Sequence, residues 1–211
     1  MERARYEKAK RNQTAKKLLR REVGCHEEII NRSNANLSIT YSKNNLSSFD
    51  ENTDLLIIGS MIPDLYYFYF GLKDRMYGSI IDQVKKTNLQ QRKNHIISLC
   101  ESGNINQAEK ERKAFIEILR EHRIAFLDLF EEALHFSNDY RDKKIEYYTI
   151  DHELFEKVKA NKNIRVYAAS IPVAVLLVEK LGFALDQFEY FQLYNGGISN
   201  NDLKAIVANK K

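Results

Sequence analysis

Long apolar runs are missing from this sequence, because nowhere do about eighteen uncharged apolar residues follow one another. That absence excludes a membrane-spanning helix of ordinary length. The first ten residues, MERARYEKAK, also lack the apolar core of a signal peptide, so we expect a cytoplasmic protein with no membrane partner. Only two cysteines occur, Cys25 and Cys100, which excludes a disulfide framework, a four-cysteine zinc site and an iron–sulfur cluster.

Several short motifs of well-known enzyme classes are missing as well. The sequence has no GxxxxGK followed by Ser or Thr, no GxGxxG and no GxSxG, so nucleotide hydrolysis, dinucleotide binding and serine-hydrolase chemistry have no motif support. The five histidines include no close pair that resembles a metal-ligand motif, and we predict no metal site. With 211 residues, 44% of them apolar and 11% aromatic, the chain suffices for one globular domain, or for one domain and a tail.

Positive charge is concentrated at the N-terminus. Residues 1–24 contain nine Lys and Arg against three Glu, a local excess of six, whereas the formal charge of the whole chain is +4. The segment ERARYEKAKRNQTAKKLLRRE, residues 2–22, is rich in helix-forming residues and precedes the first glycine, Gly24, so it predicts one helix within a basic helical arm over residues 1–31. Two interpretations stay open: the helix packs on the body through Tyr6, Leu18 and Leu19, or it is an arm that contacts phosphates.

Polar and apolar segments alternate after this arm. Residues 32–53 are rich in Ser and Asn and are predicted to be a polar connection to a single domain over 54–211. Short continuous apolar runs that end in turns are typical of buried strands. The predicted strands are 54–59, 124–130, 164–170 and, as an edge strand with more alternation, 187–193. The predicted helices are 104–122, 152–160 after a possible Asp151 cap, 171–181 with Pro172 in its first turn, and 199–208.

This order of strands and helices predicts an α/β fold, a three-layer sandwich with a central, mostly parallel sheet of about four strands. In such open sheets, ligands bind outside the carboxyl ends of the strands. The residues that follow Gly59, Phe130, Ser170 and Leu193 are therefore the first candidates for a functional site. Asp128, inside the second predicted strand, must find hydrogen bonds in the interior.

Residues 59–82, GSMIPDLYYFYFGLKDRMYGSIID, have the most unusual composition of the chain. Aromatic side chains crowd into this segment directly after a buried strand, and Gly59 and Pro63 allow a sharp turn. A group of Tyr and Phe rings offers a platform on which a planar ring can stack. The other interpretation is that about half of these rings simply cover the sheet.

This segment also resembles a known family. Gly-Ser-x-x-Pro, an aromatic cluster and then Gly-Leu-Lys-Asp-Arg-Met-Tyr are similar to the first motif of the uracil-DNA glycosylase superfamily, most of all to its mismatch-specific and hypoxanthine (deoxyinosine) branch. The stretches ILREHRIAFLDLFEEALHFSNDYRDKKI and NIRVYAASIPVAVLLVEKLG resemble later parts of that family, so the likeness covers about residues 54–183. The resemblance implies a DNA glycosylase of base excision repair, which hydrolyses the N-glycosidic bond of a flipped deaminated base, hypoxanthine or uracil, without a metal or other cofactor. Its implied partner is DNA, single- or double-stranded.

The resemblance further implies roles for individual residues. Asp74 matches the polar catalytic residue of the hypoxanthine branch, and Asp64 is the second candidate for a carboxylate that stabilises the sugar cation and holds water. The implied substrate-binding residues are Gly59, Ser60, Met61, Tyr69 as the stacking ring, Phe70, Tyr77 and Ser137. The implied DNA-binding residues are Ser170, Asn195, Gly196, Gly197 and Ser199.

Two departures from the family pattern keep other hypotheses open. Ile62 stands where the uracil-specific branch has its catalytic Asp, and residues 193–199 lack the proline and histidine of the family's usual DNA-inserting loop. The chain is therefore interpreted as a DNA glycosylase, as a nucleic-acid-binding member that keeps the fold without the chemistry, or as an unrelated α/β enzyme acting on a small metabolite. The sequence does not predict an oligomeric state.

Overall fold

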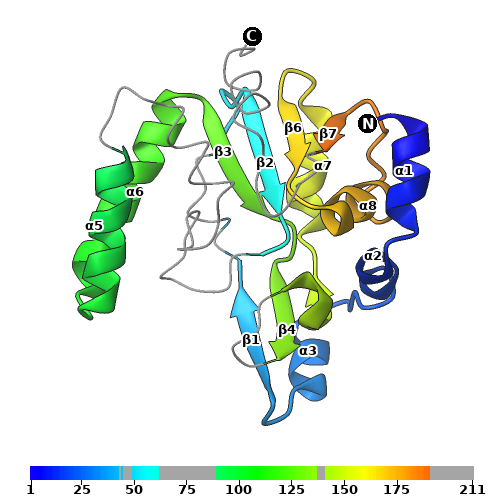
Figure 1. Ribbon diagram of the computed structural model, residues 1–211, viewed down its shortest axis with the longest axis horizontal. Coiled ribbons are helices and arrows are strands. Elements are labelled where there is room, and N and C mark those ends of the chain that lie inside the picture. The colour runs from blue at the N-terminus through cyan, green and yellow to red at the C-terminus, as the bar shows by residue number, and fades with distance from the viewer. Residues whose placement is uncertain (43, 45–48, 62–88, 137–140, 191–211) are drawn as a thin grey trace.

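A parallel sheet of four strands forms the centre of the protein (Figure 1). The computed structural model describes residues 1–42, 44, 49–61, 89–136 and 141–190. The strands of the sheet are β2 (Leu55–Gly59), β3 (Ile124–Asp128), β6 (Arg165–Ala168) and β7 (Phe188–Tyr190), in the order β3-β2-β6-β7. All neighbouring pairs are parallel, and β7 lies at an edge as predicted. The predicted α/β class and the four-stranded parallel sheet are confirmed.

Helices flank this sheet. They are α5 (Leu89–Glu101), α6 (Ile105–Glu121), α7 (His152–Ala160) and α8 (Ile171–Glu179). In Figure 1, α5 and α6 lie beside β3, whereas α7 and α8 lie on the β6 side. The sequence predicted α6, α7 and α8 but not α5. Asp151 caps α7 as expected, since its carboxylate accepts a hydrogen bond from Leu154 N at 2.9 Å. The predicted helix 199–208 lies outside the described residues.

Side chains on both faces of β2 are buried. Leu56 and Ile58 pack with Leu127 of β3 and Ala168 of β6 in the main core, which α7 and α8 complete. Leu55 and Ile57 alternate with them toward the opposite face and are also at most 2% exposed. A strand that is buried on both faces has to be apolar throughout, which is why these short runs could be recognised in the sequence.

The strand order makes the chain reverse its direction across the sheet. From β2 it passes outward to β3 through α5 and α6, returns past β2 to β6, and continues through α8 to β7. This is a doubly wound arrangement in which the direction changes between β2 and β6. Sheets of this kind bind ligands beyond the carboxyl ends of the two strands that flank the change. The ends of β2 and β6 are therefore the places where a site is expected.

A second, antiparallel sheet was not predicted. It consists of β1 (Leu37–Tyr41), β4 (Glu132–Phe136) and β5 (Ile145–Thr149) in the order β1-β4-β5. A 3₁₀-helix, η3 (Asp142–Lys144), leads into β5. β1 lies within the segment 32–53, which the sequence indicated only as a polar connection, and most of its residues are partly exposed. This strand could not be predicted from the sequence because it lacks the continuous apolar run of a buried strand.

The N-terminal segment forms three helices, α1 (Arg3–Lys10), α2 (Gln13–Leu18) and α3 (His26–Arg32). The prediction of one uninterrupted leading helix is wrong, because Asn12 starts a new helix: its side chain accepts a hydrogen bond from Ala15 N at 3.1 Å. The packing interpretation of this segment is confirmed. Tyr6 and Leu18 are 5% and 0% exposed, Leu19 is partly buried, and both α1 and α2 contact α8. Contact with phosphates stays a prediction.

Ionic contacts hold α1 on α8. The hydroxyl of Tyr6 donates a hydrogen bond to Glu179, and Lys10 Nζ lies 2.8 Å from the same carboxylate. The hydrogen bonds from Lys10 and then Tyr6 lower the pKa of Glu179, while burial raises the pKa of the Tyr6 phenol. The carboxylate of Glu179 on α8 thus contacts two side chains of α1.

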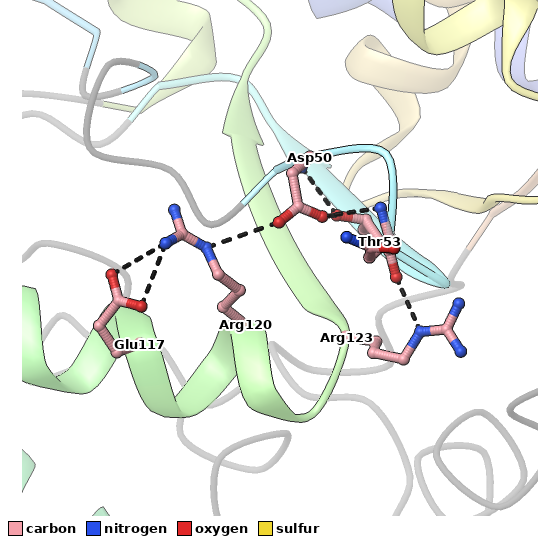
Figure 2. A network of polar contacts seen from close by, with 6 residues as sticks. Asp50, Thr53, Glu117, Arg120 and Arg123 are labelled. Atoms are coloured by element: carbon pink, nitrogen blue, oxygen red, sulfur yellow. Dashed lines mark hydrogen bonds and ion pairs between the residues drawn. The ribbon is translucent and has the colours of Figure 1, made fainter.

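Charged side chains also connect the amino end of the sheet with α6 (Figure 2). Arg120 lies between Asp50 (Nε to Oδ2, 3.6 Å) and Glu117 (Nη1 to Oε1, 3.1 Å). Arg123 pairs with Asp54 at 2.8 Å, and its backbone φ of 58° is in the left-handed region. The carbonyl of Arg123 accepts hydrogen bonds from the amides of Asp54 and Leu55. This network fixes the turn between α6 and β3 against the start of β2.

Candidate functional site

Two serines follow the strands that flank the change of direction. Ser60 comes directly after β2, and Ser170, two residues beyond the end of β6, is the N-cap of α8. The ladder extends past the strands to fix both positions: Phe130 N donates to Ser60 O at 3.0 Å, and Ala169 N donates to Ile58 O at 2.8 Å. Both serine residues are partly exposed, so their side chains lie between the core and the surface.

One carboxyl group joins the two serines. Ser60 Oγ donates to Oδ1 of Asp142 at 2.5 Å, and Ser170 Oγ donates to Oδ2 of the same side chain at 3.3 Å. Ser170 Oγ also accepts a hydrogen bond from Val173 N at 3.4 Å, which leaves its proton for Asp142. We name these three residues the Ser–Asp–Ser cluster. It links the ends of β2 and β6 to η3, which lies between β4 and β5 of the antiparallel sheet.

The electrostatic setting of Asp142 is unusual for an aspartate. Among the residues that the structure describes, its side chain has two hydroxyl partners and no ion pair. Burial raises the pKa of this carboxyl group, and the hydrogen bonds from Ser60 and Ser170 act in the opposite direction without cancelling the shift. A carboxyl group of this kind holds its proton to a higher pH than an exposed aspartate, which is typical of functional sites and of some structural ones.

Gly59 and Asp128 lie side by side at the same edge of the sheet, where the β2–β3 register pairs them. β3 is the outer strand of the sheet as far as the described residues go, and the side chain of Asn44 bonds to its last residue. Asp128 N donates to Asn44 Oδ1 at 2.7 Å, and Asn44 Nδ2 donates to Asp128 O at 2.9 Å. Asp128 is 1% exposed, as the sequence predicted for a polar residue inside a buried strand. Asn44 thus fixes the end of β3 next to the site.

The cluster contains two of the residues that the sequence singled out. Ser60 was predicted to bind substrate and Ser170 to bind DNA, and the fold places both on Asp142. Gly59 and Met61 flank Ser60, and Met61 packs partly buried against the main core. The other predicted site residues lie outside the described part of the chain: Asp64, Tyr69, Phe70, Asp74, Tyr77, Ser137, Asn195, Gly196, Gly197 and Ser199.

Asp142 was missed by the sequence analysis. The rule that pointed to Ser60 and Ser170 considers residues directly after parallel strands, whereas Asp142 precedes an antiparallel strand of the other sheet. The only available signal was the stretch ending in RDKKI, which resembles the family but does not distinguish among its aspartates. No local sequence pattern indicates that the side chain of Asp142 lies at the carboxyl ends of the parallel strands.

The described residues contain neither a candidate metal site nor a membrane-spanning helix. No group of three or more His, Cys, Asp or Glu is placed to hold a metal ion within the described ranges. None of the described helices is long and apolar enough to cross a membrane. Cys25 is exposed and Cys100 buried, and neither forms a disulfide in this part of the chain.

No protein-family model and no curated protein matches the chain. One solved structure, an NMR structure of a protein from Methanosarcina acetivorans provisionally named a uracil DNA glycosylase, has a TM-score of 0.44 and 19% sequence identity. The match covers 82% of this chain and 96% of that chain. Because both values are low, neither the fold described above nor the function proposed below rests on this likeness.

Proposed function

We propose that the chain is a DNA glycosylase that releases a deaminated base, hypoxanthine or uracil, flipped out of DNA. The observation that carries the proposal is the hydrogen bond between Ser60 and Asp142. It fixes the serine of the family-like Gly-Ser-x-x-Pro motif at the carboxyl edge, beside the change of strand direction. Sequence resemblance and the ligand-binding rule for doubly wound sheets therefore point to the same few residues.

In this proposal the Ser–Asp–Ser cluster positions the groups that bind the base. Breaking the N-glycosidic bond leaves negative charge on the departing base, and donors placed against that base stabilise the charge. The backbone amides of Ser60 and Met61 are the proposed donors, and Asp142 acts through Ser60 as a positioning residue. Ser170 lies at the N-terminus of α8, whose partial positive charge suits a DNA phosphate.

Hydrolysis also needs a carboxylate beside the sugar, and Asp74 is proposed for that role, with Asp64 as the second candidate. The bond between the sugar carbon and the base nitrogen breaks, and its electron pair leaves with the base. A water molecule forms the new carbon–oxygen bond and gives one proton to the carboxylate, while the base takes up a proton from solvent. Tyr69 is proposed as the ring on which the flipped base stacks.

Oligonucleotides that carry uracil, hypoxanthine, xanthine or a G·T mismatch test the proposal. The protein is incubated with duplexes and single strands, and alkali then cleaves the strand wherever a base has been released. We expect cleavage with at least one deaminated base and none after Asp74→Ala. Asp82→Ala, which removes another aspartate close by in the sequence, should leave the release of the base unchanged.

The same assay separates the remaining hypotheses. Binding of DNA without release of any base would contradict the glycosylase and favour a nucleic-acid-binding protein that lacks the chemistry. Absence of both binding and release would favour an enzyme that acts on a small metabolite. Release that survives Asp74→Ala but not Asp64→Ala would keep the activity and reassign the carboxylate.

A further inference from the structure

One face of the antiparallel sheet combines aromatic rings with cationic side chains. Leu134 of β4 pairs with Tyr147 of β5, and the register shifts directly after this pair. A shift of this kind inserts an extra residue into one strand and so re-aims the side chains that follow. Beyond it Lys144 meets Phe136, with Nζ 5.1 Å from the ring centroid. The irregularity therefore sets Lys144 against Phe136, two residues along β4 from the Leu134–Tyr147 pair.

Two arginines complete this surface. The guanidinium carbon of Arg21 lies 5.1 Å and that of Arg32 lies 4.5 Å from the centroid of the Tyr147 ring. Stacking on a ring orients a guanidinium group while its N–H groups stay available, and these groups match the geometry of phosphate oxygens. Phe136 is 40% exposed, which is unusual for a large apolar side chain and leaves ring surface in contact with water.

Positive charge is placed on the rings themselves rather than over the region as a whole. The elements around Tyr147 carry cations and carboxyl groups in similar number: Lys16, Lys17, Arg21, Arg32, Lys143 and Lys144 against Glu27, Glu28, Glu132, Asp142 and Glu146. Glu146 pairs with both Lys17 and Arg21, Glu132 pairs with His26, and Asp142 contacts the two serines. Arg21, Arg32 and Lys144 lie over the rings, so the ring surface presents positive charge to an anionic partner.

The surface is continuous with the Ser–Asp–Ser cluster. Asp142 and Lys144 are the first and last residues of the same 3₁₀-helix, η3. The carboxyl group of Asp142 contacts Ser60 and Ser170, whereas the ammonium group of Lys144 lies over Phe136. A chain of nucleotides with one unit at the cluster therefore has this surface within reach of its neighbouring units.

We propose that Arg21, Arg32, Phe136, Lys144 and Tyr147 form a binding surface for a single-stranded segment of nucleic acid. The cationic groups contact phosphates, and the open ring of Phe136 stacks on an unpaired base, the combination found in proteins that bind single strands without sequence preference. The position of this nucleic-acid segment, beside a nucleotide bound at the Ser–Asp–Ser cluster, rests on the proposed function. Binding to the surface itself does not depend on that function.

A fluorescent twelve-residue oligo(dT) is the probe, because it contains neither uracil nor hypoxanthine. Its affinity for the full chain is measured by anisotropy over a range of salt concentrations. We expect Phe136→Leu, which keeps an apolar side chain, to weaken binding about tenfold through loss of stacking. Arg21→Ala with Arg32→Ala should lower the slope of log K against log salt by about 1.4, the value for two phosphate contacts of a single strand.

The matched control removes two exposed lysines from other helices, Lys113 of α6 and Lys157 of α7. The double variant Lys113→Ala, Lys157→Ala changes the net charge by as much as Arg21→Ala with Arg32→Ala. Its salt slope should equal that of the unmodified protein. Arg32→Lys keeps the charge and should retain the slope while it weakens binding, because an ammonium group does not stack as a planar guanidinium group does. Thermal unfolding is recorded for every variant to show that the fold is kept.

Equal effects of the two double variants would overturn the proposal, since the affinity would then follow net charge alone. So would tighter binding of duplex than of single strand combined with no effect of Phe136→Leu. A protein that releases no base but responds to these substitutions as expected would contradict the proposed function and retain the surface. A protein that releases bases while all variants bind the probe alike would retain the proposed function and contradict the binding surface.

Discussion

The carboxyl groups at the two ends of the central sheet have different kinds of partners. At the amino end, Asp50 pairs with Arg120, which also contacts Glu117 of α6 (Figure 2). Asp54 pairs with Arg123, which also donates a hydrogen bond to the backbone carbonyl of Asn52. At the carboxyl end, the side chain of Asp142 is held by two serine hydroxyls and a backbone hydrogen bond, and none of the described residues forms an ion pair with it. Burial raises the pKa of this carboxyl group, and the hydrogen bonds do not cancel the shift.

If the proposed function is correct, this contrast separates the contacts for stability from those for function within one sheet. Ion pairs at the amino end connect elements that must stay together, and nothing about them requires an accessible group. The carboxyl end instead holds a group whose charge is costly, in the place where doubly wound sheets bind ligands. Proteins commonly keep such unfavourable arrangements at functional sites. Substitutions at the two ends should therefore affect different measurements.

Removal of the hydroxyl of Ser60 should give the largest effect. Ser60→Ala loses a hydrogen bond to a charged or partly charged carboxyl group, which corresponds to about a 10- to 100-fold lower rate of base release. The matched variant at the amino end is Thr53→Ala, because the Thr53 hydroxyl bonds to Asp50 at 3.4 Å. Rates measured on equal amounts of folded protein should not change in Thr53→Ala. Equal losses in both variants would contradict the division between the two ends.

Arg123 should give the largest effect on stability. Arg123→Ala leaves Asp54, a residue 8% exposed, without its ion pair and should lower the free energy of unfolding by about 2 kcal/mol. Arg123→Gly loses the same pair but relieves the left-handed backbone, so it should be more stable than Arg123→Ala by about 1 kcal/mol. Urea denaturation of both variants measures the difference. A glycine variant no more stable than the alanine variant would contradict the backbone argument.

The pH dependence of stability tests the setting of Asp142. Its pKa is raised in the native state, so the unfolded chain releases the proton first, and stability falls as the pH rises from the usual aspartate pKa through the raised value. The Asp142→Asn variant has no carboxyl group at this position, so its stability lacks this contribution to the pH dependence. The free energy of unfolding of Asp142→Asn, relative to the unmodified protein, should therefore increase from about pH 4 to pH 7. A difference that stays constant over this range would show that the carboxyl group titrates normally.

The smallest effect is expected for Arg120. It pairs with both Asp50 and Glu117 (Figure 2), but these carboxylate side chains are 33% and 58% exposed, whereas the Asp54 partner of Arg123 is only 11% exposed. Water screens such pairs, and Arg120→Ala should change the free energy of unfolding by about 0.5 kcal/mol or less. Comparison with Arg123→Ala under the same conditions is the measurement. A loss as large as that of Arg123→Ala would mean that the network at the amino end acts as one unit.

The fold could be predicted from the sequence wherever burial is complete. β2, β3 and β6 are continuous apolar runs because they are covered on both faces, and α8 begins with Ser170 and Pro172, which mark a helix start. The antiparallel sheet was missed because much of β1 and part of β4 and β5 stay in contact with water. Partial exposure permits polar residues at positions where a buried strand would have apolar ones.

The candidate site could be predicted only in part, for a related reason. Ser60 and Ser170 follow buried strands, and a general rule for parallel sheets selects such positions. Asp142 reaches them from a connection 82 residues after Ser60 and 28 before Ser170, and no local periodicity encodes that contact. The break between α1 and α2 was missed because Asn12 was read as one more helical residue rather than as a cap.

Helix α8 has almost no polar face, and this has a practical consequence. All residues from Pro172 to Leu177 are buried: Leu176 and Leu177 pack in the main core, while Val175 packs with Tyr6, Ala9 and Ala15 of the N-terminal helices. A recombinant fragment trimmed to 54–211 would present this apolar side to solvent and is expected to self-associate. Deletion of the basic segment is thus a poor test of whether this segment binds DNA, and charge-neutralising substitutions on the intact chain are the sound alternative.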